Sequence, residues 1–514
     1  MPDATAPAGE PLFPPGYRAS GILLHVTSLP SPFGIGDLGP GACAWIDRMV
    51  EAGQGWWQTL PLSPVGLGNS PYDPLSTFAA SPLLLSPERL WEDGLIEQRD
   101  GAAGEFPPDR VDYEAVAELK GRLLDVAWQA FRAGRGRTAE LRAQFTRFCA
   151  EHARWLDDYA LFAALQERYP DRYYLQWPEP LVRRDPLALD AARRELAGAI
   201  DRCRFGQFLL ARQGAQLRDY AHQRGVRLMG DMPFFVSPQS ADAWANPELF
   251  LLDDQCRPRV VAGVPPDYFS ATGQLWGNPV YDWNALRQTR YRWWVDRLRT
   301  LLDQVHVIRL DHFRAFTAAW HVPVSAATAE SGQWVPGPGA DFFEVAREAF
   351  GGLPFVAEDL GLITDDVRQL RDQFQLPGMR VLQFAFDGDP YNAFLPRYYV
   401  SNAVVYTGTH DNDTTRGWYA KLPREQQAGM WRYLEQPECG EDQVAWALLK
   451  LAWESRAALA IAPLQDVLNL GSEARMNVPG KPEGNWRWRA SASQLASAAF
   501  SRLADLTAAA GRRT

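Results

Sequence analysis

Short apolar runs recur along the chain, each four to six residues long and followed by a polar or glycine-rich segment. Runs of this length are typical of strands that are buried on both faces of a parallel sheet. They occupy residues 21–26, 56–60, 226–230, 305–310, 354–357, 379–384, 403–406 and 458–462. Most of them are followed by a segment that can form a helix. Eight alternating units predict an α/β fold, a (β/α)8 TIM barrel.

Apolar residues at helical spacing mark the helices of this alternation. The spacing is clearest over residues 287–302 and 364–374. It also covers residues 42–52, where we expect Trp45, Met49 and Val50 to face a core. These segments predict helices that pack around the barrel.

A long helical interruption separates the second and third strands. Apolar side chains form one stripe over residues 113–131, and a second stripe follows over residues 141–165. The glycines of Gly134-Arg-Gly136 break the pattern between them. We therefore expect a mainly α-helical insertion at about residues 85–200, on the catalytic face of the barrel.

A second excursion, at about residues 233–285, is rich in loop-forming residues, and we expect it on the same face. We expect a mobile tail over residues 1–20, because this segment is rich in proline and alanine. The remainder, residues 21–514, then forms a single catalytic domain that carries both insertions.

Charge and cysteine content narrow the class of protein. The net charge of -10 and a pI near 5.4 argue against nucleic acid or an anionic membrane as a partner. The five cysteines are widely spaced without a Cys-x-x-Cys pair, which predicts neither a disulfide framework nor a zinc site. No signal peptide or membrane-spanning run is recognisable, so we expect a cytoplasmic protein. The twenty tryptophans offer flat surfaces for sugar rings.

Four acidic residues stand at the predicted strand ends. They are Asp231, Asp311, Glu358 and Asp411, after the third, fourth, fifth and seventh strands. Catalytic side chains of a (β/α)8 barrel lie at the carboxyl ends of its strands. Carboxylates in this position can also bind Mg²⁺, or can form buried ion pairs that only orient strands.

Basic neighbours favour sugar chemistry over a metal site. Arg309 shares a strand face with Asp311, two residues away, and should keep Asp311 ionised, as a nucleophile requires. His410 stands beside Asp411. Retaining glycosidases hold a nucleophile and an acid roughly 5–5.5 Å apart, and neighbouring strands lie about 5 Å apart. Glu358 follows an apolar run that can raise its pKa toward that of a general acid, although Glu358-Asp359 can also cap a helix.

Several motifs resemble the signatures of the 4-α-glucanotransferases (amylomaltases or disproportionating enzymes) of glycoside hydrolase family 77. The motifs are residues 69–72, 263–269, 273–279, 309–314, 357–361 and 409–412. The resemblance runs from about Gly21 to Trp488, with the motifs in the order of the family. Ser81 and Ala271 depart from the family pattern, outside the catalytic acids.

The resemblance implies a role for each of these residues. Asp311 is expected to be the nucleophile, Glu358 the acid/base, and Asp411 the third carboxylate, bonded to sugar hydroxyls. The residues implied to hold substrate are Tyr72, Asp231, Asp267, Tyr268, Phe269, Trp276, Asn278, Arg309, His312, His410 and Asn477. For His312, Tyr268 and Phe269 a packing role is the alternative. The resemblance implies no cofactor and no metal.

The expected reaction is retaining transfer between α-1,4-glucans such as maltooligosaccharides. A covalent glucosyl-enzyme forms on Asp311, and the 4-hydroxyl of a second glucan replaces water as acceptor. An α-glucan hydrolase with the same acids and a glucan-binding protein without activity are the alternatives. The products formed from maltotriose distinguish these three functions.

Overall fold

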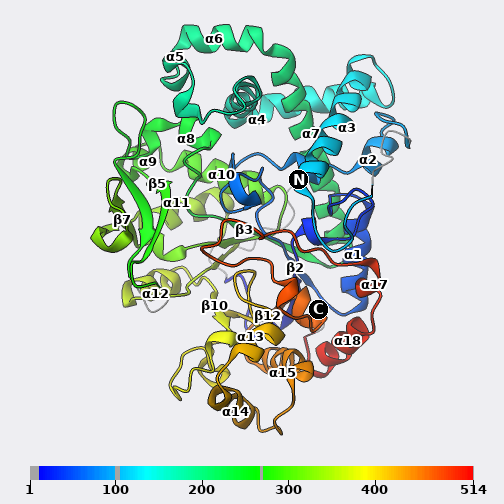
Figure 1. The fold of residues 1–514 in the computed structure, drawn as a ribbon, viewed down its shortest axis with the longest axis vertical. Helices are drawn as coiled ribbons and strands as arrows, with labels where there is room; N and C mark the ends of the chain where they lie inside the picture. The colour runs from blue at the N-terminus through cyan, green and yellow to red at the C-terminus, as the bar shows by residue number, and fades with distance from the viewer. Residues whose placement is uncertain (1–10, 99–104, 267–269, 513–514) are drawn as a thin grey trace.

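A closed barrel of eight parallel strands forms the centre of the protein (Figure 1). The computed structural model describes residues 11–98, 105–266 and 270–512. The barrel strands are β1 (Ala19–Leu23), β2 (Trp56–Gln58), β3 (Arg227–Met232), β6 (Val307–Leu310), β9 (Phe355–Ala357), β10 (Gly378–Val381), β11 (Ala403–Tyr406) and β12 (Leu459–Pro463). They follow the chain order around the ring, and β12 closes it against β1. The predicted (β/α)8 barrel is confirmed.

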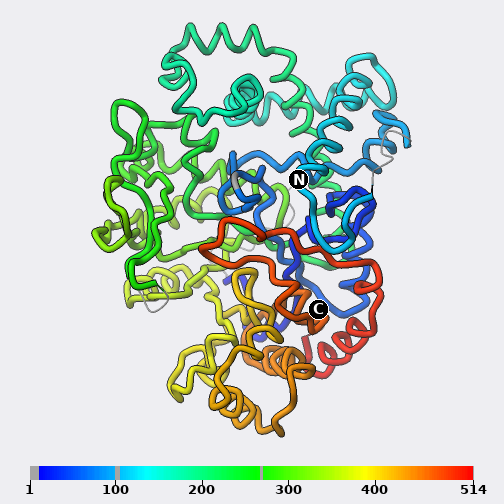
Figure 2. Tube along the Cα trace, viewed as in Figure 1, coloured from blue at the N-terminus to red at the C-terminus, as the bar shows by residue number. Residues whose placement is uncertain are grey.

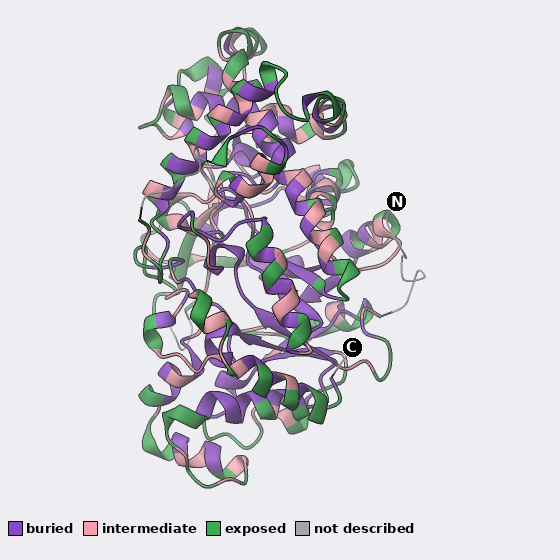
Figure 3. Cartoon of the chain, turned by 90° about the vertical axis from the view of Figure 1, so that its right-hand side faces the viewer, coloured by how far each residue is buried: buried purple, intermediate pink, exposed green. Residues whose placement is uncertain are grey.

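Side chains alternate between the inside and the outside of this barrel. On β6, Val307 joins the apolar interior with Met229 and Val356, whereas Ile308 and Leu310 pack outward beneath the helices. The strands are buried at the centre of the molecule, and the exposed residues lie on the outer helices (Figure 3). Because the strand period is two, Arg309 points inward with Val307.

Helices cover the outside of the barrel. They are α1 (Pro40–Glu51), α9 (Trp283–Gln288), α10 (Arg292–Leu302), α11 (Ala340–Phe350), α12 (Asp365–Gln373), α13 (Thr415–Lys421), α14 (Arg424–Tyr433), α15 (Glu441–Glu454), α16 (Leu464–Val467), α17 (Ala492–Leu495) and α18 (Ala499–Ala509). The helix predicted over residues 287–302 is two helices, because Arg290 and Tyr291 adopt positive φ angles of 52°. The prediction for Val50 is wrong: its exposed fraction is 42%, since α1 buries the stripe of Trp45, Ile46 and Met49.

The segment between β2 and β3 forms a helical layer at the top of Figure 1. Its helices are α2 (Pro87–Glu92), α3 (Tyr113–Arg132), α4 (Thr138–Arg168), α5 (Glu179–Val182), α6 (Pro186–Glu195) and α7 (Ala197–Gln223). A buried ion pair joins this layer to the barrel, because Lys120 on α3 donates to Asp37 at 2.8 Å and to the carbonyl of Leu85.

The excursion after β3 contains strands that the sequence pattern does not reveal. After the short helix α8 (Ala241–Ala245), β4 (Val260–Val264) and β5 (Gln274–Pro279) pair with β7 (Ala318–Pro323) and β8 (Gln333–Pro336) in an antiparallel sheet of order β5-β4-β7-β8. Two of these strands come from beyond β6. Pairing between distant segments, and the register shift between β4 and β5, leave no local alternation to recognise.

The predicted mobile tail is too long. Of its described residues, Phe13 is 4% exposed and stacks on Tyr17, and Arg18 donates to the carbonyls of Trp453 and Ser455. Aromatic residues near the chain start therefore help to close the amino-terminal end of the barrel, a role that proline- and alanine-rich composition conceals.

Arg512 fixes the closing seam between β1 and β12. Its buried guanidinium donates to the carbonyls of Trp453, Ser455, Ala457, Ala458 and Ala19, the last across 493 sequence positions. In Figure 2 the last helix, α18, lies beside the first, α1, where the rings of Phe500 and Trp45 are 5.9 Å apart. In the described part of the chain, no helix is both long and apolar enough to span a membrane.

Candidate active site

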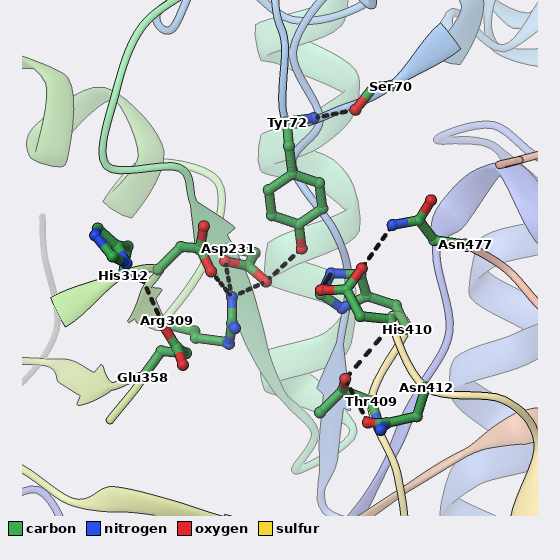
Figure 4. Close-up of polar contacts among 12 residues, drawn as sticks. Ser70, Tyr72, Asp231, Arg309, His312, Glu358, Thr409, His410, Asn412 and Asn477 are labelled. Carbon is green, nitrogen blue, oxygen red and sulfur yellow. Dashed lines mark hydrogen bonds and ion pairs between the residues drawn. The ribbon is translucent and has the colours of Figure 1, made fainter. Parts of the chain in front are cut away.

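The four predicted acids lie at the same end of the barrel, where the strands finish. Asp231 is the penultimate residue of β3, Asp311 follows β6, Glu358 follows β9, and Asp411 lies in the loop after β11. Strand β6 pairs with β3 on one side and with β9 on the other. Figure 4 shows that Arg309 lies between Asp231 and Glu358. The sequence therefore placed the acids on the correct strands, although Asp231 belongs to the strand itself.

Arg309 joins two of these carboxylates. Its Nη1 lies 2.8 Å from both oxygens of Asp231 and 2.9 Å from Oδ1 of Asp311. Burial alone would lower the pKa of Arg309, but Asp231 and Asp311 outweigh burial and raise that pKa well above its ordinary value. The guanidinium remains charged. Its positive charge is shared between the carboxylates of Asp231 and Asp311.

Asp231 and Asp311 differ in access to solvent. The Asp231 side chain is fully buried, whereas the Asp311 side chain is 29% exposed. The alternative of a buried, orienting ion pair therefore describes Asp231, with Arg309 as its partner. Asp311 keeps one oxygen that Arg309 does not bind, on a side chain that a substrate can reach.

Glu358 has the environment of a protonated acid. Burial raises its pKa from 4.5 to about 8, with a further contribution from the charge of Asp311. Arg309 and the backbone N–H groups of Leu360 and His312, at 3.0 and 2.8 Å, act in the opposite direction without cancelling burial. At neutral pH the Glu358 carboxyl can therefore donate a proton beside Asp311.

The turn after Asp311 positions the backbone N–H of His312 as a donor to Glu358. His312 adopts the left-handed conformation, with φ 50° and ψ 47°, which aims its N–H at Oε2 of Glu358. Positive φ is uncommon outside glycine, although histidine tolerates it better than most residues. The nucleophile and acid segments are thus tied directly to each other.

Asp359 has a structural role. Its carboxylate accepts from the backbone N–H of Met379 at 2.6 Å and pairs with Arg371 and Arg380. The N-cap of α12 is Thr364, five residues further on. The helix-capping alternative for Asp359 is therefore wrong, and the residue fixes β9 against β10 instead.

Asp411 is the most exposed of the acids, with 47% of its side chain accessible. His410 Nε2 lies 3.4 Å from Oδ2, and Asn477 Nδ2 donates to Oδ1 at 2.6 Å. Sequence reasoning missed Arg475, which donates to the carbonyls of Asp411 and Asn477 and thereby joins their two loops. Its position two residues before Asn477 was the only available signal.

Tyr72 connects the two sides of the site. Its hydroxyl donates to Oδ2 of Asp231 at 2.8 Å, and its ring is stacked on that of His410, with centroids 4.9 Å apart and planes 9° apart. Trp486, another residue that sequence reasoning missed, lies against both rings. One face of the Tyr72 ring is therefore covered by His410.

We predict that Tyr72→Phe lowers kcat/KM for maltotriose about tenfold, because Asp231 loses a hydrogen bond that helps to hold it beside Arg309. The ring and its stacking on His410 are retained, so Tm should change little. Tyr72→Ala also removes the stacking surface and should lower activity further. Equal activity of Tyr72→Phe and the unchanged protein would show that the bond to Asp231 is not needed.

The remaining predicted residues differ in position. Trp276 is 39% exposed and meets His312 edge to face at 4.9 Å. The His312 Nε2 atom is buried without a protein partner among the described residues, and burial lowers the pKa of this histidine to about 4. Asn278 donates to the carbonyl of Val236, a contact that fixes its loop. Asp267, Tyr268 and Phe269 lie outside the described residues.

A closed parallel barrel that brings Asp231, Asp311, Glu358 and Asp411 to the carboxyl ends of its strands has the arrangement of an enzyme active site. Comparison with known proteins narrows this class. Residues 24–494 match the family model described as 4-alpha-glucanotransferase.

The 4-alpha-glucanotransferase of Synechocystis is 47% identical over 504 residues, which cover 96% of this chain and 98% of that protein. That of Thermus thermophilus is 46% identical over 502 residues, covering 96% and 99%. The amylomaltase of Streptococcus agalactiae, solved in complex with acarbose, superposes with a TM-score of 0.92 at 33% identity, covering 97% and 100%. The chain belongs to the 4-alpha-glucanotransferase family, and its activity is the transfer of glucan segments.

Proposed function

We propose that the protein transfers a segment of one α-1,4-glucan to the 4-hydroxyl of another glucan, or of glucose, by double displacement with retention. The observation that carries this proposal is a site in which Arg309 bonds Asp311 at 2.9 Å and burial raises the pKa of the nearby Glu358 to about 8. Two neighbouring carboxyl groups in opposite protonation states are what the first step needs.

In the first step, the free oxygen of Asp311 attacks the anomeric carbon of the donor glucan. The glycosidic bond breaks, and Glu358 gives its proton to the departing oxygen. A covalent glucosyl-enzyme remains on Asp311, and Glu358 is left ionised. Arg309 stays bonded to Asp231 throughout, so the site keeps its positive charge.

In the second step, Glu358 accepts the proton of the acceptor 4-hydroxyl, and the resulting oxygen attacks the same anomeric carbon. The bond to Asp311 breaks, which restores both carboxyl groups to their first states. We assign to Asp411 the bonding of hydroxyls on the reacting sugar, because its carboxylate is exposed and is held in place by His410 and Asn477. Tyr72, Trp276 and His312 offer the surrounding ring surfaces.

Product analysis tests this function against its alternatives. Maltotriose incubated with the protein should give glucose together with a ladder of longer oligosaccharides. Shorter products alone would mean hydrolysis, and unchanged maltotriose would mean a binding protein. The comparison requires only chromatography of the products over time.

The raised pKa of Glu358 predicts the basic limit of activity. The first step needs the protonated acid, which persists up to about pH 8 and is lost as the pH rises further. We therefore expect kcat/KM for maltotriose to fall above about pH 8. A limit in the ordinary carboxyl range, near pH 4.5, would contradict the protonation state assigned to Glu358.

We further place the enzyme among glycosyltransferases of the hexosyl type and in a reducing compartment, the cytoplasm. All five cysteines are free thiols, and proteins of reducing compartments rarely form disulfides. The net charge of -10 supports neutral glucans, rather than nucleic acids or anionic membranes, as its partners.

A further inference from the structure

Met379 makes an unusual contact with the central arginine of the site. Its thioether Sδ lies 3.3 Å from Nε of Arg309, inside the barrel, where Met379 has no exposed surface. Nε is the donor on the side of the guanidinium stem, and Nη1 is the donor that joins Asp231 and Asp311. One residue on β10 therefore fixes the inner end of the side chain whose outer end bonds the nucleophile.

A thioether is a suitable acceptor at this position because it is weak and uncharged. A third carboxylate beside Arg309 would compete with Asp231 and Asp311 for the guanidinium and for its charge. An aliphatic side chain would leave Nε–H buried without an acceptor, which is costly for a donor on a charged group. Sulfur satisfies the donor and leaves the full charge to the two aspartates.

The backbone of Met379 is held from the acid/base side of the site. Its N–H donates to Oδ1 of Asp359 at 2.6 Å, and Asp359 is the residue after Glu358. A continuous path of contacts therefore runs from the Glu358 segment through Asp359 and Met379 to Arg309 and Asp311. Glu358 is the chain neighbour of Asp359 at one end of this path, and Asp311 accepts from Arg309 at the other end.

We propose that Met379 is a positioning residue: its sulfur orients Arg309, so that Nη1 bonds the free nucleophile Asp311 while β10 holds the acid/base segment in register. This inference rests on the roles proposed above for Asp311 and Glu358. Met379 has no exposed surface, so we assign it an action through the guanidinium of Arg309 rather than on substrate.

The test uses Met379→Leu, which keeps the side-chain volume and removes the acceptor. We expect kcat for maltotriose to fall about tenfold. Because Arg309 bonds Asp311 less well, the acidic limit of kcat/KM should move to higher pH, by about half a pH unit or more. Met379→Gln, whose Oε1 can accept from Nε–H, should recover part of kcat and return the acidic limit toward its original pH.

Met229→Leu is the matched control, since Met229 is an equally buried methionine of the barrel interior, on β3. No hydrogen bond to its sulfur is found among the described residues, so this variant should keep kcat within about twofold and leave the pH profile unchanged. If Met379→Leu and Met229→Leu give the same pH profile, or differ only in Tm, Met379 is a packing residue and the proposal is overturned.

The same samples separate this inference from the proposed function. The products from maltotriose report transfer or hydrolysis, whereas the pH limits can be measured for either reaction. Absence of longer oligosaccharides would overturn the proposed transfer and leave the comparison of the two methionines intact. A shifted acidic limit in Met379→Leu alone would support the positioning role.

Discussion

Asp311→Asn should lower transfer about a thousandfold or more. Asparagine has nearly the shape of aspartate but cannot attack the anomeric carbon, so the covalent intermediate does not form. The loss of rate is larger than the loss of one substrate contact would cause, because proton transfer by Glu358 cannot promote the first step without a nucleophile. The measurement is the initial rate of glucose release from maltotriose.

The fold should survive this change. Arg309 remains paired with Asp231, so the substitution leaves no unpaired buried charge, and Asp311 is already partly exposed. Tm should therefore stay close to that of the unchanged protein. Retention of a tenth of the activity in Asp311→Asn would assign the nucleophile elsewhere.

Glu358→Gln should give a loss of similar size with a different signature. Maltotriose has a poor leaving group that needs a proton, so transfer from it should fall about a hundredfold to ten-thousandfold. An α-glucosyl fluoride needs little protonation, and its first step should largely survive. The glucosyl-enzyme should then accumulate, because no base remains to activate the acceptor.

Mass spectrometry of the intact protein distinguishes the two carboxylates. With the fluoride donor, Glu358→Gln should carry one covalent glucosyl group and Asp311→Asn should carry none. Rapid fluoride release by Glu358→Gln without any modified protein would contradict the acid/base role. Glu358→Gln should also lose the activity limit near pH 8, since the titrating group is gone.

The barrel could be predicted from the sequence because each of its strands is a short apolar run that is recognisable without knowledge of its partners. In β6, alternation predicts that Arg309 and Asp311 share one face, and the structure turns Val307 inward and Ile308 outward. The positions of the acids follow from the same pattern, because residues at the carboxyl ends of parallel barrel strands all lie on one face of the barrel. A feature that depends only on the local sequence, such as the position of Asp311 after a buried strand, could therefore be predicted.

Features that depend on distant partners were not predictable in this way. The break before α10 arises from positive φ angles at Arg290 and Tyr291, neither of which signals a turn by its side chain. Strand β4 is stabilised by β7, more than fifty residues later, and no local period records that pairing. The contact of Met379 with Arg309 joins two ordinary residues of separate strands, so it becomes visible only when β9 and β10 are in place.

The hydrogen bond from Arg512 to the carbonyl of Ala19 has a consequence for folding during protein synthesis. A ribosome adds about 5–20 residues per second, so β1 waits on the order of half a minute or more before β12 and Arg512 emerge. During that interval one edge of β1 has no strand to pair with and is open to wrong partners or to chaperones. Barrel closure is thus a late, long-range event, and slow synthesis or a shortened carboxyl end should lower the yield of folded enzyme before it lowers the activity of each molecule.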